Sequence, residues 1–568
     1  MKNAILTHPV CLVMFCILAP ATACESSGGT VADSDSSTGN DTDTETDSVP
    51  PDTSLPDVVW PSITPVDTPE TFLHMPGYSP VVAGAVGEFA LAGRYVFGTS
   101  LNNGRDDMVT FSGSGIFLSR FSQTGDLLMT AQVTGNSGEP RAIAYMENDD
   151  LLLVGTMTGD LTFHTGLDTI TLPASETAIW DSFVARFNAD GNLVWVEKIS
   201  TDDQVRVADA AVFENGDFVI TGSYAGNTVF GEGQPLEETL TSVVVGEFNS
   251  GGVFTARYGG DGTLQWVRAG RDAYPNTDRQ PASNSILVHE DGSCTAVGTF
   301  DIRIHFWDGQ MVEELYSYAS DGLFLVRYDE DGAIADIRRS YSDYLGETTG
   351  IQASRFDDDS LLVTGDFRRR IFFGAYEPNE TIVTSIDEMD FDMYIGHYAP
   401  DLSLNWVKTI SGMSNAWTND VTAVATLADG SGLLSGTITD DQVVNPDDCN
   451  AVRLDAVDSE ETIFLSRYGS TGTVTGILTA RAPSIRVVQM DRMNEYGFIL
   501  TGIISGNGTF FPDASAPVTV QPWSEESEIY VYLGSSNAFD ATVESCVPQP
   551  DSDTETPALR RTSNSAAI

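Results

Sequence analysis

Three features of the sequence predict an all-β protein, a seven-bladed β-propeller of four-stranded blades that follows a signal peptide and a disordered acidic tether. A strand motif recurs about every 70 residues, an apolar run ending in glycine precedes each copy, and tight-turn sequences separate the runs. No segment shows a sustained helical period. A radial array suits this length, because each repeat packs only on its neighbours and no single core has to grow.

The N-terminal segment indicates export. Residues 10–19 (VCLVMFCILA) form an apolar run that is too short to span a bilayer and typical of a signal peptide. The small residues before Cys24 resemble a bacterial lipoprotein signal, which implies that Cys24 is lipidated. Ala21 stands where that family usually has Leu, so cleavage after Ala23 without lipidation remains an alternative. Glu25, rather than Asp, after the cysteine favours the outer membrane or cell surface.

A polar segment follows this signal. Residues 24–57 are rich in Ser, Thr, Asp, Gly and Pro and contain almost no large apolar residue. Such a segment cannot bury a core, and we expect a disordered, self-repelling tether. The sequence therefore predicts a signal peptide at 1–23, a tether at 24–57, a propeller at 58–548 and a disordered tail at 549–568.

The chain is strongly acidic. It carries 82 Asp and Glu against 28 Lys and Arg, a formal net charge of −54. This balance excludes unaided nucleic-acid binding, which needs clustered basic residues, and disfavours electrostatic docking onto anionic lipid. The acids are spread through the turns of the whole body, which favours a solvated exterior over one cation site.

The cysteines fit an exported protein. Cys294 lies in an alternating apolar run, and we expect it to be a buried thiol. Cys449 and Cys546 both lie in polar surroundings and could form a disulfide, although their spacing cannot establish it. No CxxC or His-linked pattern indicates a zinc site.

The repeat unit reads as four strands, a to d. Strand c carries the pattern Phe-x-x-Arg-Phe/Tyr, and strand b is the apolar run upstream that ends in glycine. Asn-Gly and Asp-Gly turns join a to b and c to d, because these residues supply the positive φ of a tight hairpin. The seven copies of strand c lie at 117–121, 183–187, 254–258, 324–328, 394–398, 464–468 and, in decayed form, 530–534. The glycines are Gly93, Gly155, Gly222, Gly298, Gly365, Gly436 and Gly502.

The motif set resembles the bacterial seven-bladed β-propeller repeat family. Its blades carry an apolar run ending in Thr-Gly, an aromatic-x-x-Arg/Lys-Tyr strand and Asp-Gly-x-Leu-x-Trp. Thr221-Gly222, residues 183–187 and residues 190–195 match these three elements. Met129, Asp336 or Gly476 replaces the tryptophan in other blades, so we expect those blades to pack differently. The resemblance implies the fold and an extracytoplasmic location, and it supplies no catalytic residues.

The long b–c and d–a connections share one face and are the expected place for recognition. Aromatic and basic side chains on the d–a connections could stack on sugars or peptides, or could instead fill gaps between blades. The candidate ligand-binding residues are Arg271, Tyr274, Tyr341, Tyr344 and Trp417, accompanied by Arg279 and Asn415. The arginines repeated in strand c, and Trp195, Trp266 and Trp406, are expected to join neighbouring blades.

Three functions remain open. We expect a non-catalytic, lipid-anchored binding or scaffolding module for polysaccharide or an envelope protein, monomeric and without a cofactor. One alternative is a calcium-stabilised adhesion propeller of FG-GAP type, although Asn188/Asp190 and Asp329/Asp331 supply only half of a calcium loop. The other is a propeller enzyme acting on polysaccharide, or a quinoprotein. The sequence contains no Gly-x-Ser-x-Gly elbow and no Walker or Rossmann glycine pattern.

Overall fold

The computed structural model describes residues 81–535 with short gaps, and these residues belong to one compact unit spanning 55–568. The predicted signal peptide, tether and C-terminal tail lie outside the described residues. The gaps are 86, 96–99, 102–108, 123–124, 136, 246–247, 273–279, 310–311, 318–320, 343–345, 387–390, 413–419, 447–450, 458–459, 494–496, 511–517 and 521–527.

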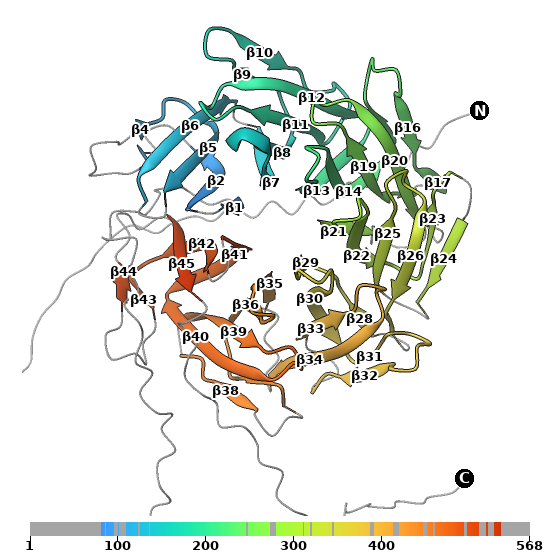
Figure 1. The fold of residues 1–568 in the computed structure, drawn as a ribbon, viewed down its shortest axis with the longest axis vertical. Helices are drawn as coiled ribbons and strands as arrows, with labels where there is room; N and C mark the ends of the chain where they lie inside the picture. The colour runs from blue at the N-terminus through green and yellow to red at the C-terminus, as the bar shows by residue number, and fades with distance from the viewer. Residues whose placement is uncertain are drawn as a thin grey trace, which may run out of the picture. The chain divides into compact units, whose positions relative to one another are not determined.

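The fold is a seven-bladed β-propeller, as the sequence predicts. Antiparallel sheets stand around a central axis, and each begins at that axis and runs outward in chain order (Figure 1). Blade 1 consists of β1 (Val81–Ala85), β2 (Glu88–Tyr95), β5 (Gly115–Ser122) and β6 (Leu127–Thr134). Blade 2 consists of β7 (Gly138–Tyr145), β8 (Leu151–Met157), β11 (Asp181–Phe187) and β12 (Leu193–Thr201). Blade 3 consists of β13 (Gln204–Val212), β14 (Phe218–Ala225), β19 (Gly252–Tyr258) and β20 (Leu264–Asp272).

Blades 4 to 6 repeat this order, and blade 7 has three strands among the described residues. Blade 4 consists of β21 (Ala282–Val288), β22 (Cys294–Phe300), β25 (Gly322–Tyr328) and β26 (Ile334–Arg339), and blade 5 consists of β28 (Glu347–Thr348) with β29 (Gln352–Arg355), β30 (Leu361–Arg368), β33 (Asp392–Tyr398) and β34 (Leu404–Gly412). Blade 6 consists of β35 (Asp420–Thr426), β36 (Gly432–Ile438), β39 (Glu461–Tyr468) and β40 (Val474–Ala482). Blade 7 consists of β41 (Ser484–Arg492), β42 (Gly497–Ser505) and β45 (Glu528–Ser535).

The four strands of the repeat form the blades as predicted, and the long b–c connections add further strands to them. Most of these connections form a β-hairpin that pairs with the outermost strand of the preceding blade and extends its sheet. These hairpins lie at the rim of the ring (Figure 1), away from the axis. They are β9 (Leu161–His164) with β10 (Thr169–Leu172), β15 (Asn227–Phe230) with β16 (Glu238–Thr241), β23 (Arg303–Trp307) with β24 (Val312–Tyr316), β31 (Arg370–Phe373) with β32 (Thr381–Thr384), β37 (Gln442–Val444) with β38 (Val452–Leu454), and β43 (Gly508–Phe510) with β44 (Val518–Val520).

A few short elements complete the described chain. In the fourth hairpin, β31 pairs with β27, a short continuation of the outer strand of blade 4. The others are β27 (Tyr341–Ser342), β3 (Ser100–Leu101) with β4 (Val109–Thr110), β17 (Val243–Val245) with β18 (Phe248–Ser250), and the 3-10 helix η1 (Glu147–Asp149).

The core consists of layers between adjacent blades, and strand c shows how two-residue alternation builds them. Phe183, Ala185 and Phe187 of β11 pack into a cluster shared with blade 1, whereas Val184 packs into a cluster shared with blade 3. Every residue of β11 except Arg186 is therefore buried, because each face meets a neighbouring blade. Blade packing of this kind explains why the strand motifs are apolar on both faces.

Side-chain packing and hydrogen bonds close the ring between blades 7 and 1. Val82 and Leu91 of blade 1 share an apolar cluster with Met493, Ile499 and Ile529 of blade 7. The carboxylate of Asp491 accepts a hydrogen bond from the Gly84 N–H at 2.9 Å. Blade 7 thus contacts blade 1 much as the other blades contact one another.

Cys294 lies in β22 as a buried free thiol, as predicted, and burial raises its pKa to about 12. Within the described residues, no helix has the length and apolar character needed to cross a bilayer.

Candidate functional site

A one-residue bulge in the innermost strand of most blades turns a side chain toward the axis. In β13 the pairing with β14 jumps from Val207 to Asp209, so Ala208 has no partner residue. Bulges re-aim side chains and are common near binding sites. The bulge residues are Arg141, Ala208, Asn284, Thr422 and Val488, and the same one-residue shift between β28 and β29 leaves Ile351 in this position in blade 5.

The glycine that ends each apolar run makes room for this arrangement. A Cβ on Gly222 would lie 2.0 Å from the Arg206 carbonyl oxygen, and a Cβ on Gly502 would lie 1.9 Å from the Arg486 carbonyl oxygen. The aromatic ring that begins strand c covers the other side, as Phe254 does at Gly222. The glycine signature therefore marks where the innermost strand presses against its neighbour.

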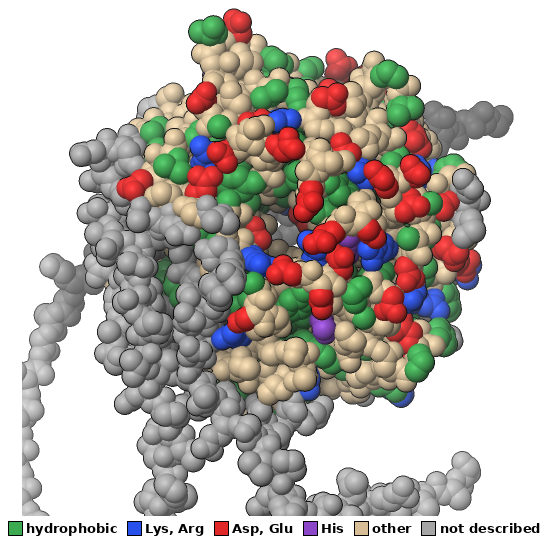
Figure 2. All heavy atoms as spheres, in the orientation of Figure 1, with side chains coloured by type: hydrophobic (Ala, Val, Ile, Leu, Met, Phe, Trp, Pro, Cys, Tyr) green, Lys and Arg blue, Asp and Glu red, His purple; other side chains and the backbone are tan. Residues whose placement is uncertain are grey.

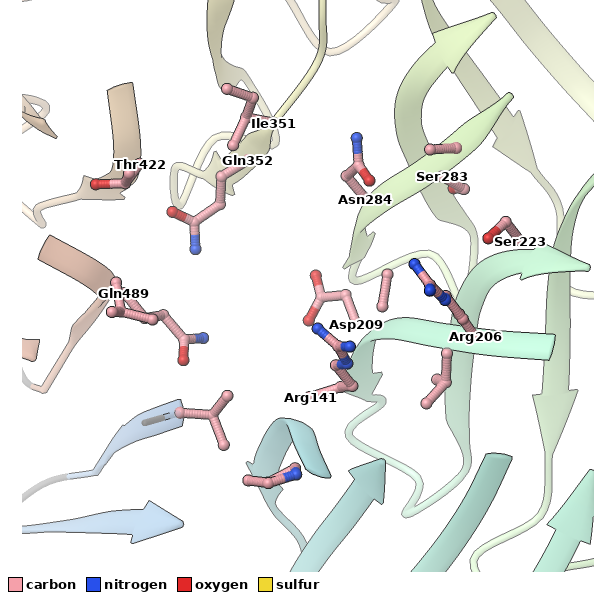
Figure 3. A pocket seen from close by; sticks show the side chains of 16 residues that line it. Arg141, Arg206, Asp209, Ser223, Ser283, Asn284, Ile351, Gln352, Thr422 and Gln489 are labelled. Atoms are coloured by element: carbon pink, nitrogen blue, oxygen red, sulfur yellow. The ribbon is translucent and has the colours of Figure 1, made fainter. Parts of the chain in front are cut away.

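The bulge residues line a cavity of about 370 Å³ in the central channel. Figure 3 shows Arg141, Arg206 and Asp209 on one side, with Gln352, Thr422 and Gln489 facing them. All seven innermost regions contribute, from Val81 in blade 1 to Gln489 in blade 7. Around this hollow the face seen in Figure 2 carries both acidic and basic side chains.

The residue after the bulge joins one blade to the next. Each innermost strand is a sheet edge with unpaired N–H groups. Asp209 accepts a hydrogen bond from the Ile286 N–H at 2.9 Å, and the Ser285 hydroxyl accepts one from the Ala353 N–H at 3.3 Å. The amide oxygens of Gln352 and Gln489 likewise accept bonds from the N–H groups of Val424 (3.0 Å) and Val82 (2.8 Å).

These bonds fix which polar groups face the cavity. Because the amide oxygens of Gln352 and Gln489 are engaged, their NH₂ groups remain as donors. The Asn284 NH₂ group donates to the Gly350 carbonyl at 2.6 Å, which leaves the amide oxygen as an acceptor. The buried Thr422 hydroxyl has no hydrogen-bond partner within the described part of the chain.

Two arginines give the cavity a positive side. The Arg141 guanidinium pairs with Glu139 at 2.7 Å. The Arg206 guanidinium carbon lies 3.6 Å from the centroid of the Trp180 ring, a cation–π contact that fixes its plane. Partial burial and the charge of Arg141 lower the pKa of Arg206, while Glu139 opposes them. The two guanidinium groups are therefore close enough to repel each other.

Asp209 is the one carboxylate among the described residues that line the cavity. Burial raises its pKa to about 6, although hydrogen bonds from Ile286, Ala210 and Ser285 favour the charged form. Asp491, in the same innermost layer, has its pKa raised to about 6 by burial, with a contribution from Asp209. At the face with the a–b turns, Arg492 of blade 7 bonds Asp357 of blade 5 at 2.7 Å.

The structure places two of the candidate ligand-binding residues, and neither lines the cavity. Arg271 lies within the outer strand β20, paired with His305 of the rim hairpin. Tyr341 lies in β27 and stacks on Phe372, with ring centroids 4.5 Å apart, and on Tyr376 at 5.6 Å. Tyr274, Arg279, Tyr344, Asn415 and Trp417 lie outside the described residues, as do Cys24, Cys449 and Cys546.

The repeated arginines and tryptophans join adjacent blades, as predicted. Arg257 is almost fully buried, pairs with Asp217 of its own blade at 3.1 Å and donates to the Gly292 carbonyl of the next blade at 2.9 Å. Trp266 donates its indole N–H to the Glu330 carbonyl of the next blade at 2.9 Å. Their roles are therefore structural.

Metal chemistry finds no geometric support in the described part of the chain. No group of three or more His, Cys, Asp or Glu side chains is arranged there to hold a metal ion. Asn188 Oδ1 accepts hydrogen bonds from the N–H groups of Asp190 and Asn192, and Asp329 accepts them from Asp331 and Ala333. These half-loops of the calcium hypothesis therefore stabilise tight turns.

The sequence prediction missed the channel residues, because it placed recognition on the long loops. A usable signal existed: the short first strands of the repeats contain polar residues in otherwise apolar stretches. Examples are Arg141 in GEPRAIAY, Arg206 and Asp209 in QVRVADAAV, and Asn284 in ASNSILV. A polar residue in an inner strand has to face water or a hydrogen-bonding partner, and the central channel is where an inner strand can meet water.

Comparisons with known proteins give remote structural likenesses alone. No family model and no curated protein matches the sequence. A Bacteroides caccae protein of unknown function aligns at TM-score 0.28 and 9% identity, over 63% of this chain and 88% of that one. A Dyadobacter fermentans protein of unknown function aligns at 0.32 and 8%, over 71% and 98%. The phage phi92 endosialidase aligns at 0.33 and 10%, over 86% and 70%. Likeness at this level identifies neither ligand nor reaction.

Proposed function

We propose that this chain is a non-catalytic binding module that takes its ligand in the central channel. The observation that carries the proposal is the polar cavity of about 370 Å³ lined by bulge residues of successive blades. Pockets of this size with a few fixed polar groups are typical of small-ligand sites. The amides of Asn284, Gln352 and Gln489 that face it are oriented by hydrogen bonds to neighbouring blades, so these groups are preorganised.

The cavity chemistry favours binding over hydrolysis. Glycoside hydrolysis generally uses a pair of carboxyl groups on either side of the scissile bond. The described lining supplies Asp209 alone, and its carboxylate is already bonded to Ser285 and Ile286. A Ser–His pair does occur at Ser360 and His397, but the Ser360 hydroxyl donates to Asp358 and is buried within a turn.

The module is proposed to be exported and tethered to the outer membrane or cell surface through a lipid on Cys24. The support is the apolar run at 10–19, the small residues before Cys24 and the acidic tether, with the resemblance to lipoprotein propellers of the repeat family. Cys24→Ala tests the anchor: the variant should appear in the soluble fraction of cells. Membrane partition equal to that of the unchanged chain would contradict it.

A channel-filling variant tests the binding site. Ala208→Trp places an indole in the cavity and removes no existing contact group, whereas Leu167→Trp adds the same side chain at a position that is 99% exposed on the rim. On an array of neutral and acidic glycans, the Ala208→Trp variant should lose binding and the Leu167→Trp variant should keep it. Unchanged binding by a folded Ala208→Trp variant would place the site elsewhere.

A further inference from the structure

We propose that the central channel selects saccharides that carry an oxyanion, a carboxylate or a sulfate, and that Arg141 and Arg206 bind this group. The proposal rests on the channel being the binding site. It adds the ligand class and names the two residues that recognise it.

The first support is a positive charge that the protein leaves without a partner. Arg206 makes no direct ion pair among the described residues, although the charge of Glu139 acts on it, and Trp180 holds its guanidinium by stacking. Arg141 has Glu139, but its Nε is buried and makes no hydrogen bond within the described part of the chain. In a chain of net charge −54, two neighbouring guanidinium groups with so little compensation require an explanation.

The second support is the direction of the nearby carboxylate. Asp209 lines the same wall, yet Oδ2 accepts bonds from Ser285 and Ile286 of the next blade and Oδ1 accepts one from the Ala210 N–H. The structure shows no ion pair from Asp209 to either described arginine. The Asp209 carboxylate therefore links two blades by hydrogen bonds, and it leaves the two arginines available to an external anion.

The third support is the hydrogen-bonding character of the cavity. Both guanidinium groups and the NH₂ groups of Gln352 and Gln489 are donors, while the Asn284 amide oxygen accepts and the Thr422 hydroxyl can do either. A ligand that complements this set carries many acceptor oxygens and a few hydroxyl donors. A sugar with an oxyanion has both, and planar guanidinium groups bind carboxylate and sulfate through paired hydrogen bonds.

An anion between the arginines would also remove an unfavourable interaction. The charge of Arg141 acts against the charged form of Arg206, and the charge of Glu139 opposes this effect. A bound oxyanion replaces this repulsion with two attractions. The surrounding acidic surface would repel the same ligand, so selectivity would arise in the channel itself.

The test compares oligosaccharides of equal length by titration calorimetry on the full mature chain. The probes are an oligogalacturonate, a sulfated galacto-oligosaccharide and a neutral galacto-oligosaccharide, with poly-glutamate as an acidic peptide. At least one acidic saccharide should bind about tenfold or more tightly than the neutral one, and added salt should weaken that preference. The carboxylate and sulfate arms show which oxyanion is preferred.

Variants assign the residues. Arg206→Met keeps the aliphatic stem and should remove about tenfold of the affinity for the acidic saccharide without changing that for the neutral one. Arg206→Lys should fall between, because a lysine keeps the charge and loses the planar pair of donors. Arg453→Met removes an exposed arginine of rim strand β38 and should leave both affinities unchanged.

The outcomes separate this inference from the proposed function. Equal affinity for acidic and neutral saccharides, with binding still blocked by Ala208→Trp, would overturn oxyanion selection and leave the binding module standing. An equal loss for both saccharides in Arg206→Met would also overturn it. Tighter binding of poly-glutamate than of either acidic saccharide would reject the saccharide class. Full affinity in the Ala208→Trp variant would show that the channel is not the binding site.

Discussion

Asp209 should make the stability of the propeller depend on pH in a direction opposite to that of an ordinary paired carboxylate. Burial raises its pKa from 3.8 to about 6. The folded state therefore binds the proton more tightly than the unfolded state does. Its contribution to the free energy of unfolding is fully present below about pH 4 and is lost as the pH rises through about 6.

The perturbation is Asp209→Asn, which cannot ionise and whose amide oxygen can still accept the bond from the Ile286 N–H. A shift of about two pKa units corresponds to about 3 kcal/mol, an upper limit because the side chain retains some contact with the channel. Between pH 4 and pH 7 the unchanged protein should lose up to about 3 kcal/mol relative to the Asn variant. The effect of losing the other acceptor contacts is independent of pH and cancels in this difference.

Urea denaturation of both proteins at several pH values from 4 to 7.5 measures this double difference. Most other carboxylates titrate alike in both proteins and cancel as well. Asp491 is the exception, because Asp209 contributes to its raised pKa, and the measured difference includes the loss of this repulsion. Asp202→Asn supplies an opposite control, because hydrogen bonds from Asn227 lower the pKa of Asp202 and its stabilising contribution is present at neutral pH. Parallel stability curves for the unchanged protein and Asp209→Asn would refute the reasoning.

The remaining predictions concern the joints of the fold. Arg257→Met should cost about 3 to 5 kcal/mol in denaturant unfolding, since it removes the ion pair of Asp217 and the donor to the Gly292 carbonyl, whereas Arg453→Met on the exposed rim should leave stability nearly unchanged. Gly222→Ala should cost about 1 to 3 kcal/mol in the same assay, because its Cβ would overlap backbone of the adjacent strand. Cys294 should react with a thiol reagent only at the rate of unfolding, because it is buried and its pKa is raised; rapid reaction of the folded chain would contradict this.

The architecture was predictable because the same packing contacts recur in each of the seven repeats. A glycine at the end of strand b and an aromatic at the start of strand c are the two halves of one contact, as Gly222 and Phe254 show. A repeated arginine must meet the same partner in each blade, and Arg257 and Arg327 both reach an aspartate of their own blade and a carbonyl of the next. Residues that recur once in each blade therefore have structural roles.

The sequence did not reveal the rim hairpins or the bulges, because their contacts are not marked by a residue that recurs in each blade. The rim hairpins pair with the preceding blade, and nothing in their short, variable strands names that partner. The bulge of the innermost strand depends on an extra residue that changes the pairing register, which a pattern of apolar residues does not locate. Arg141 and Asn284 are equivalent in position but differ in type, so a search for repeated residues passes over them.

This contrast gives a way to judge the Ser360–His397 pair, which has the composition of a nucleophile and its base. His397 occupies the strand-c position that is Arg327 in blade 4. Ser360 occupies the turn position of Ser293, whose hydroxyl accepts a bond from Arg327 and donates to Asp291. Blade 5 therefore contains the same joint with a histidine in place of the arginine, and burial lowers the pKa of His397. A residue that replaces a periodic residue keeps its structural role. Arg141 and Asn284, by contrast, differ in type at equivalent positions in the channel, where sequence differences between blades can serve a ligand.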